Sequence, residues 1–349
     1  MRFLTAGESH GPGVIALLDG VPAGLALSSA EIDADLRRRQ LGYGRGARQK
    51  IERDEVRVTG GVRQGRTTGA PIALQILNRD AVNWERVMSV EPVSEPPDAV
   101  TRLRPGHADL AGALKFGHED VRDTLERASA RQTAITVAAG AVAKALLREI
   151  GVEVAGSVVE MGDVDAARAE RDTVGGVVEV RAGGVPPGLG SYATKEDRLD
   201  ARLAAALMGI QAVKGVEVGE GFGLAALRGS QAHDEILGGA ESLHRETNRA
   251  GGIEGGVSNG EEVVVRAAMK PLPTLMRPLR SVDLQTGEPG EALVERSDVA
   301  AVEALSVVAE NSVAFELARA AREKFGGDAL ADFVAAYRAY LERIPWQPH

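Results

Sequence analysis

Two histidines in glycine-rich turns are the residues best suited to acid–base chemistry in this sequence. His10 lies in Gly7-Glu-Ser-His-Gly11, and His107 lies in Arg104-Pro-Gly-His-Ala-Asp109. The chain has six histidines and no cysteine, and the imidazole is the side chain that ordinarily titrates near neutral pH. Glycine frees the backbone to approach a ligand. We therefore treat both as candidate acid–base groups, against the alternative of a histidine that is merely exposed or satisfied in the core.

Clustered cations suggest that the substrate is an anion. The chain carries a net charge of −9, yet one short stretch is basic and contains Arg37, Arg38, Arg39, Arg45, Arg48, Lys50 and Arg53. Three glycines between Leu41 and Ala47 predict a loop there. A bound polyanion would explain this stretch, but so would a solvated helix end followed by a loop.

Other cations lie beside the candidate histidines or at predicted element ends. Arg104 precedes His107 and suits a phosphate or a carboxylate. Arg127 and Arg131 flank Ser129 at a predicted helix N-terminus, which favours either an anion or simple capping by the serine. We find no metal-ligand spacing and no obvious nucleophile. This pattern suits an anionic substrate whose difficult chemistry is carried by a bound cofactor.

The elements that would position these residues predict an α+β fold. Strands are expected at Arg2–Ala6, Val14–Leu18, Glu55–Gly60, Pro71–Leu77, Glu153–Met161, Val177–Ala182, Val216–Gly219 and Val263–Ala268. Helices are expected at Ser29–Gln40, Ser129–Ile150 (with Ser129 and Gln132 as a capping box), Lys195–Gly209, Val299–Phe325 and Asp328–Glu342. Because strands and helices do not alternate regularly, α+β is favoured over a doubly wound sheet. The length alone leaves one large domain or two lobes open.

Composition limits the class of protein further. Aromatic residues are only 3% of the chain, so the core is expected to consist of aliphatic side chains. The absence of cysteine fits a reducing compartment and predicts a cytoplasmic protein. The net negative charge disfavours nucleic-acid binding, and no apolar run suits a membrane span.

Several separated motifs, in order along nearly the whole chain, resemble chorismate synthase. They are Gly7–Gly11 with Asp19-Gly-Val-Pro22, Arg37-Arg-Arg-Gln-x-Gly42, Arg104-Pro-Gly-His107, Arg127-x-Ser-Ala-Arg131, Gln211-Ala-Val-Lys-Gly215, Gly251–Gly260, Lys270-Pro271 and Arg296-Ser-Asp298. The resemblance implies a single large domain over residues 1–349, an α+β sandwich with helices between two antiparallel sheets, and a homotetramer. Two departures are Gln132, where the motif usually has glutamate, and the residues after Asp298.

The resemblance also implies a reaction. The family converts 5-enolpyruvylshikimate 3-phosphate to chorismate and phosphate by a 1,4-anti elimination, with reduced FMN but no net redox change. It implies that His10 protonates the leaving phosphate, that His107 protonates or stabilises the reduced flavin, and that Ser9 and Asp298 form a relay to flavin N5. NADPH is a possible flavin reductant.

Binding roles carry over to matched positions. FMN contacts are expected at Arg127, Ala128, Ser129, Gln211, Ala212, Gly255, Lys270, Pro271, Leu272, Pro273, Thr274 and Arg296. Arg39 and Arg45 match NADPH-binding positions, although they could serve the substrate, and Arg48, Arg104 and Arg131 would bind the substrate. Two other classes stay open: an FMN-dependent oxidoreductase acting on a phosphorylated anion, and a polyanion-binding protein without catalysis.

Overall fold

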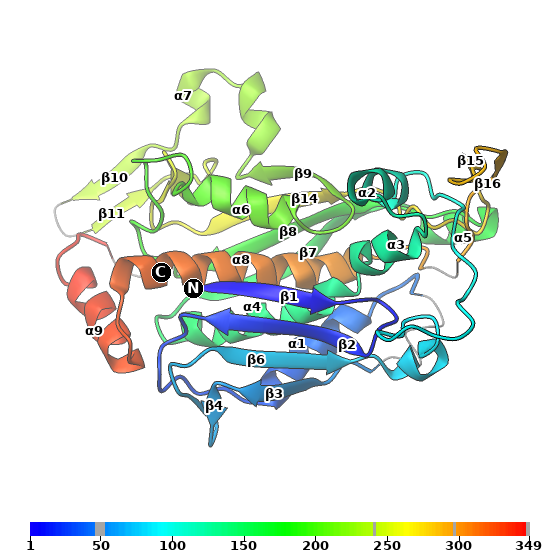
Figure 1. Cartoon of the computed structure of the whole chain (residues 1–349). Coiled ribbons are helices and arrows are strands. Elements are labelled where there is room, and N and C mark those ends of the chain that lie inside the picture. The colour runs from blue at the N-terminus through cyan, green and yellow to red at the C-terminus, as the bar shows by residue number, and fades with distance from the viewer. Residues whose placement is uncertain (46–52, 240–241, 296–297, 347–349) are drawn as a thin grey trace.

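The computed structural model describes residues 1–45, 53–239, 242–295 and 298–346, and it contains two four-stranded antiparallel sheets (Figure 1). The first sheet has the order β1-β2-β6-β3, formed by Arg2–Gly7, Gly13–Asp19, Ile72–Leu77 and Val56–Gly60. The second has the order β7-β8-β14-β9, formed by Glu153–Met161, Gly176–Gly183, Val263–Met269 and Val213–Val218. Side chains alternate between buried and more exposed along β2 and β6, which gives the first sheet one core face.

Three helices fill the space between the sheets. They are α1 (Ser29–Gln40), α4 (Gln132–Arg148) and α8 (Val302–Phe325). Helix α4 packs on the first sheet and α8 on the second, and the two helices pack extensively on each other (Figure 1). Small residues permit this close approach, because a Cβ atom on Gly140 would stand 2.4 Å from the Cβ of Asn311 on α8. One continuous aliphatic core therefore runs through both sheets and the helices between them.

A buried ionic cluster joins the inner helices to the second sheet. Glu310 of α8 is almost fully buried and accepts hydrogen bonds from Arg38 of α1 at 2.7 Å and from Lys144 of α4 at 2.5 Å. It also accepts from the backbone N–H of Gly156 on β7 at 2.9 Å. Burial raises the pKa of Glu310, but hydrogen bonds and charge from Arg38 and Lys144 lower it by more. The pKa of Glu310 therefore lies below the ordinary value.

Shorter elements surround the sandwich. They are β4 (Val62–Arg63), β5 (Arg66–Thr67), η2 (Arg79–Trp84), α2 (Asp109–Phe116), α3 (Arg122–Ala128), α5 (Val164–Glu170), α6 (Leu199–Met208), η3 (Gly221–Ala226), α7 (Gly229–Ala232), β10 (Ile236–Gly239), β11 (Ser242–Arg245), β12 (Ile253–Glu254), β13 (Val257–Ser258), β15 (Arg280–Val282), β16 (Pro289–Glu291) and α9 (Leu330–Leu341). Helices α2 and α3 lie at the end of the sandwich toward which β1 runs (Figure 1). No helix in the described ranges is both long and apolar enough to cross a membrane.

The α+β prediction and the sandwich with helices between two antiparallel sheets are confirmed, but three helices begin at least three residues later than predicted. Helix α8 begins at Val302 rather than Val299. Helix α4 begins at Gln132 rather than Ser129, with Arg131 as a cap that makes no side-chain capping bond. Ser129 is extended and ends α3, so the expected capping box does not form. Helix α6 begins at Leu199 instead of Lys195, because the residues before it form a turn in which Ser191 N–H donates to the Asp197 carbonyl.

Candidate active site

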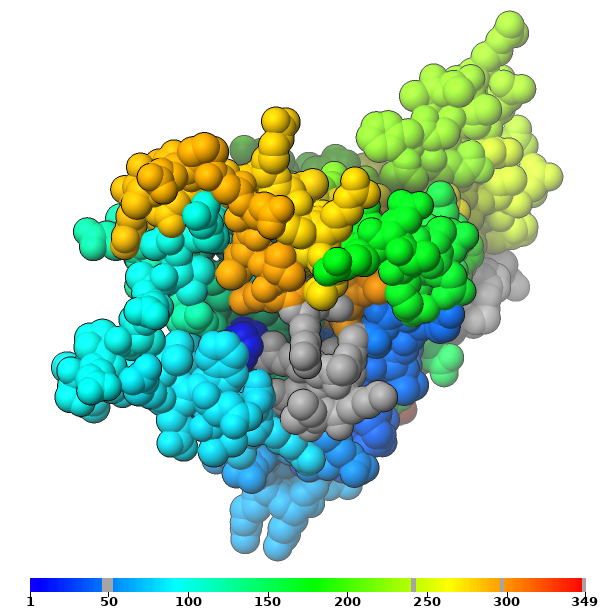
Figure 2. All heavy atoms as spheres, turned by 90° about the vertical axis from the view of Figure 1, so that its right-hand side faces the viewer, coloured from blue at the N-terminus to red at the C-terminus, as the bar shows by residue number. Residues whose placement is uncertain are grey.

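The turn between β1 and β2 lies at the end of the sandwich where several candidate residues meet. Figure 2 views that end and shows a hollow, with dark-blue N-terminal atoms at its floor between cyan and orange segments of the chain. Gly7 makes the sharp entry to this turn at φ +108°, and a Cβ atom there would stand 2.2 Å from the Gly13 carbonyl oxygen. The sequence therefore needs glycine here to turn the chain toward His10.

His10 is held by a buried glutamate. Its Nδ1 lies 2.8 Å from Glu126 Oε1, and its backbone N–H donates to Glu126 Oε2 at 2.8 Å. The imidazole also stacks on Trp84, with ring centroids 4.0 Å apart and an interplanar angle of 29°. Burial raises the pKa of Glu126, but hydrogen bonds and charge from His10, with the charge of Arg122, hold its net pKa below the ordinary value. An ionised carboxylate only accepts, so Nδ1 carries a proton.

Asn78 fixes the backbone of the same turn. Its Nδ2 donates to the carbonyl oxygens of Glu8, Ser9 and Gly11 at 3.1, 3.1 and 2.7 Å. Its Oδ1 accepts from Arg131 Nε at 2.6 Å. Asn78 thus couples the histidine turn to one of the predicted substrate arginines.

Ser9, the residue before His10, contacts the junction between α3 and α4. Its side chain is buried, its N–H donates to the Glu126 carbonyl at 3.1 Å, and its hydroxyl accepts from Ser129 Oγ at 3.2 Å. The α3–α4 junction therefore places Ser129 beside the turn that carries His10.

Two buried arginines share one carboxylate. Arg131 Nη1 donates to Asp54 Oδ1 at 2.6 Å, and Arg39 Nη1 donates to Asp54 Oδ2 at 3.2 Å. Arg39 also donates to Thr133 Oγ1 at 2.9 Å and to the Ala130 carbonyl at 3.2 Å. Burial lowers the pKa of Arg39 to about 10, with Asp54 opposing this and the nearby Arg131 and Arg45 adding to it. Arg39 is thus bound mainly within the protein.

Arg45 and Asp298 form an ion pair close to this group. Arg45 Nη1 lies 2.9 Å from Asp298 Oδ2, and Arg45 Nε is buried with no hydrogen-bond partner among the described residues. A buried donor without a partner is costly unless something bonds to it. This side chain therefore retains hydrogen-bonding capacity for an anionic ligand.

His107 has its own carboxylate partner. His107 Nδ1 lies 2.5 Å from Asp109 Oδ1, and Arg104 donates to Asp109 through its backbone N–H, Nε and Nη2. Burial raises the pKa of Asp109, but hydrogen bonds from His107 and Arg104 bring its net pKa down to about 2. Arg104 Nη1 also bonds Glu295 at 2.9 Å. Both candidate histidines are thus carboxylate-bound at Nδ1.

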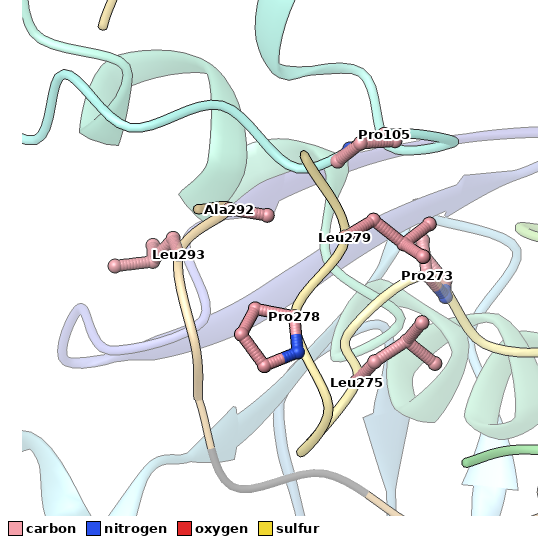
Figure 3. A pocket seen from close by; sticks show the side chains of 7 residues that line it. All are labelled: Pro105, Pro273, Leu275, Pro278, Leu279, Ala292 and Leu293. Carbon is pink, nitrogen blue, oxygen red and sulfur yellow. The ribbon is translucent and has the colours of Figure 1, made fainter. Parts of the chain in front are cut away.

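The predicted flavin segment Lys270–Thr274 lies against the His107 turn. Lys270 Nζ donates to the Gly106 carbonyl at 2.5 Å. Burial lowers the pKa of Lys270, with a smaller contribution from the charge of Lys214. Figure 3 shows the apolar pocket beside this contact, lined by Pro105, Pro273, Leu275, Pro278, Leu279, Ala292 and Leu293. These side chains bring the predicted flavin segment and the His107 turn together around one pocket.

A small apolar cluster supports both histidine groups. Leu103, Val121 and Leu125 pack together and are nearly fully buried. Leu103 precedes Arg104, and Leu125 precedes Glu126. The same apolar cluster therefore anchors both the His107 turn and Glu126, the residue that holds His10.

A second cavity, of about 400 Å³, lies between β1, α4, α6 and α8. Arg127, Gln132 and Gln211 contribute polar side chains to its lining. Arg127 also donates to the Thr5 carbonyl at 3.0 Å, and Gln132 Oε1 is buried without a partner in the described structure. The predicted flavin residues Arg127 and Gln211 thus line one cavity.

Not all predicted residues converge within one chain. Ala212 follows the end of α6 and accepts from Lys270 N–H at 3.0 Å, which joins it to the flavin segment. Gly255 lies near the start of α6, where the adjacent Gly256 carbonyl accepts from Leu199 N–H at 2.8 Å. Ten helical residues span about 15 Å, so Gly255 and Ala212 lie at opposite ends of α6. Arg48 and Arg296 lie outside the described residues.

Sequence reasoning missed the residues that hold the histidines and arginines. They are Asp54, Asn78, Trp84, Asp109 and Glu126. Asp109 stands two positions after His107 and could have been found from that spacing. The other contacts join segments far apart in sequence, for which a single chain offers no local signal. Among the described residues, no group of three or more His, Cys, Asp or Glu side chains could hold a metal ion.

The fold and this site define an α+β enzyme with two carboxylate-bound histidines among buried arginines. The family model described as chorismate synthase matches residues 1–166 and 161–321. The chain is 53% identical to the chorismate synthase of Desulforudis audaxviator over 99% of this chain and 98% of that protein, and 52% identical to that of Geobacter sulfurreducens over 99% of both. A solved structure, "Crystal Structure of Chorismate Synthase", superposes with a TM-score of 0.78 at 36% identity, covering 99% of this chain and 98% of the other.

This chain therefore belongs to the chorismate synthase family. Members named chorismate synthase are lyases of the shikimate pathway to aromatic amino acids.

Proposed function

We propose that this protein eliminates phosphate from 5-enolpyruvylshikimate 3-phosphate to form chorismate, by a 1,4-anti elimination that depends on reduced FMN. The main structural support is His10, whose Nδ1 is bound to Glu126 in the same site as the Arg39–Asp54–Arg131 group. An imidazole among cations suits protonation of a leaving phosphate, because the cations offset the charge that develops on its oxygens.

The arginines fit a substrate with one phosphate and two carboxylates. Arg45 Nε supplies a buried donor that has no partner among the described residues, and Arg131 is already oriented by Asp54 and Asn78. In this proposal Arg45, Arg104 and Arg131 orient the anion, with Arg48 expected to join them. Arg39 shares Asp54 with Arg131 and makes a similar set of hydrogen bonds within the protein, so it stays a candidate for the same anion or for NADPH.

The residues present also fit a flavin mononucleotide. Gln132 Oε1 is a buried acceptor without a partner, Lys270 is a cation beside the His107 turn, and Arg127 and Gln211 line the cavity of about 400 Å³. Ala128, Ser129, Ala212 and the Lys270–Thr274 segment would hold the ring and phosphate, with His107 near the ring. When bound, reduced flavin would supply electron density to the reaction and an acceptor for the substrate proton.

Ser9 and Asp298 are proposed to carry that proton. Ser9 Oγ bonds Ser129 in the floor of the site, and Asp298 is paired with Arg45. A hydroxyl and a carboxylate can each accept a proton and pass it on. His10 acts at the other end of the reaction, where its imidazolium gives a proton to the departing phosphate oxygen.

The position of Gly255 supports an assembly of several copies. Gly255 lies at the far end of α6 from Ala212. A flavin contact at Gly255 would therefore come from a second copy, which accords with the proposed homotetramer. A cytoplasmic address, and NADPH as a possible flavin reductant, complete the proposal. The lack of cysteine accords with a reducing compartment.

One anaerobic assay tests the function. The protein is incubated with photoreduced FMN and 5-enolpyruvylshikimate 3-phosphate, and chorismate, inorganic phosphate and the flavin spectrum are followed together. The proposal predicts equal release of chorismate and phosphate while the flavin stays reduced. Flavin oxidation matched to product would favour the FMN-dependent oxidoreductase, and binding without product would leave only a polyanion-binding protein.

A further inference from the structure

Glu126 is a buried carboxylate that is bound chiefly to the turn carrying His10. Its side chain is 2% exposed. Oε1 accepts from His10 Nδ1, Oε2 accepts from His10 N–H, and the Glu126 backbone carbonyl accepts from Ser9 N–H at 3.1 Å. The other partner of this carboxylate among the described residues is Arg122, one turn earlier on α3, whose Nη1 donates to Oε1 at 3.2 Å. Because burying an unpaired carboxylate is costly, this pairing is built into the fold.

The contacts of His10 leave one ring nitrogen for chemistry. Nδ1 bonds Glu126, and the ring face stacks on Trp84. In the described structure, the hydrogen bonds of the imidazole are those of Nδ1 to Glu126. With the ring fixed by a carboxylate on one edge and an indole on one face, Nε2 is the ring nitrogen that makes no hydrogen bond within the described residues.

We propose that Glu126 is a positioning residue for the elimination, holding His10 with Nδ1 protonated and Nε2 available to the leaving phosphate. This inference rests on the proposed function. In the step concerned, the substrate C–O bond breaks with its electron pair going to phosphate, and the Nε2 proton of the imidazolium moves to that oxygen. The neutral imidazole that remains keeps its proton on Nδ1. That N–H donates to Glu126, which stays ionised throughout.

The backbone of the turn has separate support, so the role of Glu126 can be isolated. Asn78 binds three carbonyl groups of the turn without involving Glu126. In Glu126→Gln, one carboxylate oxygen becomes an amide nitrogen, so the side chain loses one of the acceptors that serve Nδ1 and the His10 N–H. The ring and its tautomer should therefore change while Asn78 keeps the turn in place.

The test compares Glu126→Gln with Glu126→Asp and with a matched control on the same helix. Asp123→Asn removes one carboxylate charge from the exposed face of α3. We expect Glu126→Gln to lower kcat by at least about tenfold, as for other carboxylates that orient a catalytic histidine, with little change in KM or in FMN affinity. Asp123→Asn should match the wild type, and Glu126→Asp should recover part of the loss.

Two further readouts separate positioning from a general structural effect. In a His10→Ala background, Glu126→Gln should cause little additional loss of turnover, because its effect passes through His10. An equal loss in both backgrounds would overturn the inference. In apo protein labelled with ¹⁵N-histidine, His10 should show a protonated Nδ1 in the wild type and an altered signal in Glu126→Gln. A wild-type signal unchanged by the substitution would also overturn it.

These outcomes also keep the inference apart from the proposed function. Wild-type protein that forms no chorismate, yet shows the expected Glu126-dependent histidine signal, would refute the function while upholding the contact. Wild-type protein that forms chorismate, with Glu126→Gln at full kcat, would refute the positioning role and leave the function standing.

Discussion

Asp54 Oδ1 accepts a hydrogen bond of 2.6 Å from Arg131 Nη1, while its other oxygen binds Arg39. The Asp54 side chain is fully buried, and both arginine side chains are 8% exposed. The carboxylate thus allows two guanidinium groups to lie close together away from water. Two buried cations need a counter-charge even when no ligand is bound, and Asp54 provides it here.

Asp54→Asn is therefore expected to destabilise the protein by about 3 kcal/mol, because it leaves two buried cations without their shared counter-charge. Urea unfolding at neutral pH measures this change. The control is Asp165→Asn, which removes an exposed partner of Arg168 and should cost less than about 1 kcal/mol. Equal stability of the Asp54 variant and the wild type would show that the arginines do not depend on this carboxylate.

Asp109 predicts a stability contribution that is lost in acid. Its pKa of about 2 in the folded protein lies below the ordinary aspartate pKa of 3.8. A carboxyl with a depressed folded pKa stabilises the protein above its unfolded pKa, and that contribution disappears as the pH falls toward the folded pKa. The contribution is about 2 kcal/mol at neutral pH.

The gap in unfolding free energy between wild type and Asp109→Asn should therefore narrow as the pH falls from 5 to 2. A carboxyl ¹³C titration of Asp109 gives a direct check, with an expected midpoint near pH 2. A midpoint close to 3.8 would mean that His107 and Arg104 do not stabilise the ionised form.

The stacking of Trp84 on His10 predicts a smaller effect on kcat than loss of His10 itself. Its ring stacks on the imidazole with centroids 4.0 Å apart, and Asp80 accepts from its Nε1 at 3.0 Å. Trp84→Ala should lower kcat roughly fivefold if about 1 kcal/mol of stacking orients the imidazole in the transition state. Trp84→Phe retains an aromatic face and serves as the control. If steady-state kinetics gave the same kcat for both variants, the stacking would have no role in catalysis.

Much of the fold could be predicted from the sequence because its signals are local. Alternation of apolar residues at Ile72–Leu77 predicts a half-buried strand, and the alanine-rich run of α4 predicts a buried helix. The helix predicted at Ser29–Gln40 forms as α1, and a capping box of Ser28 and Glu31 starts it. Ser129 does not cap α4 because the helix begins only at Gln132, and the Ser129 hydroxyl oxygen accepts from Arg131 N–H, which lies before the helix.

The candidate site was predictable in its residue types but not in its pairings. Glycine turns and clustered cations point to His10, His107 and the arginines. The partner of His10 stands 116 positions away, and the contact depends on how α3 lies against the β1–β2 turn. Arg39 shows the same limit, since its place in a basic stretch predicts a solvent-facing cation while α1 turns it into the core.

The sharpest prediction for the proposed reaction concerns the two histidines themselves. His10→Ala and His107→Ala should each lower turnover by roughly 10²-fold or more, the range for loss of an acid–base group. Both variants should still bind FMN, because the Lys270–Thr274 segment and the cavity beside Arg127 do not depend on either imidazole. Single-turnover rates with reduced FMN, together with flavin binding by fluorescence, measure the two quantities separately. His233→Ala is the control, since that histidine caps the short helix α7, on another part of the molecule. Near wild-type turnover in both the His10 and the His107 variants would refute the roles assigned to them, whereas loss of FMN binding in either would move that histidine from proton transfer to cofactor binding.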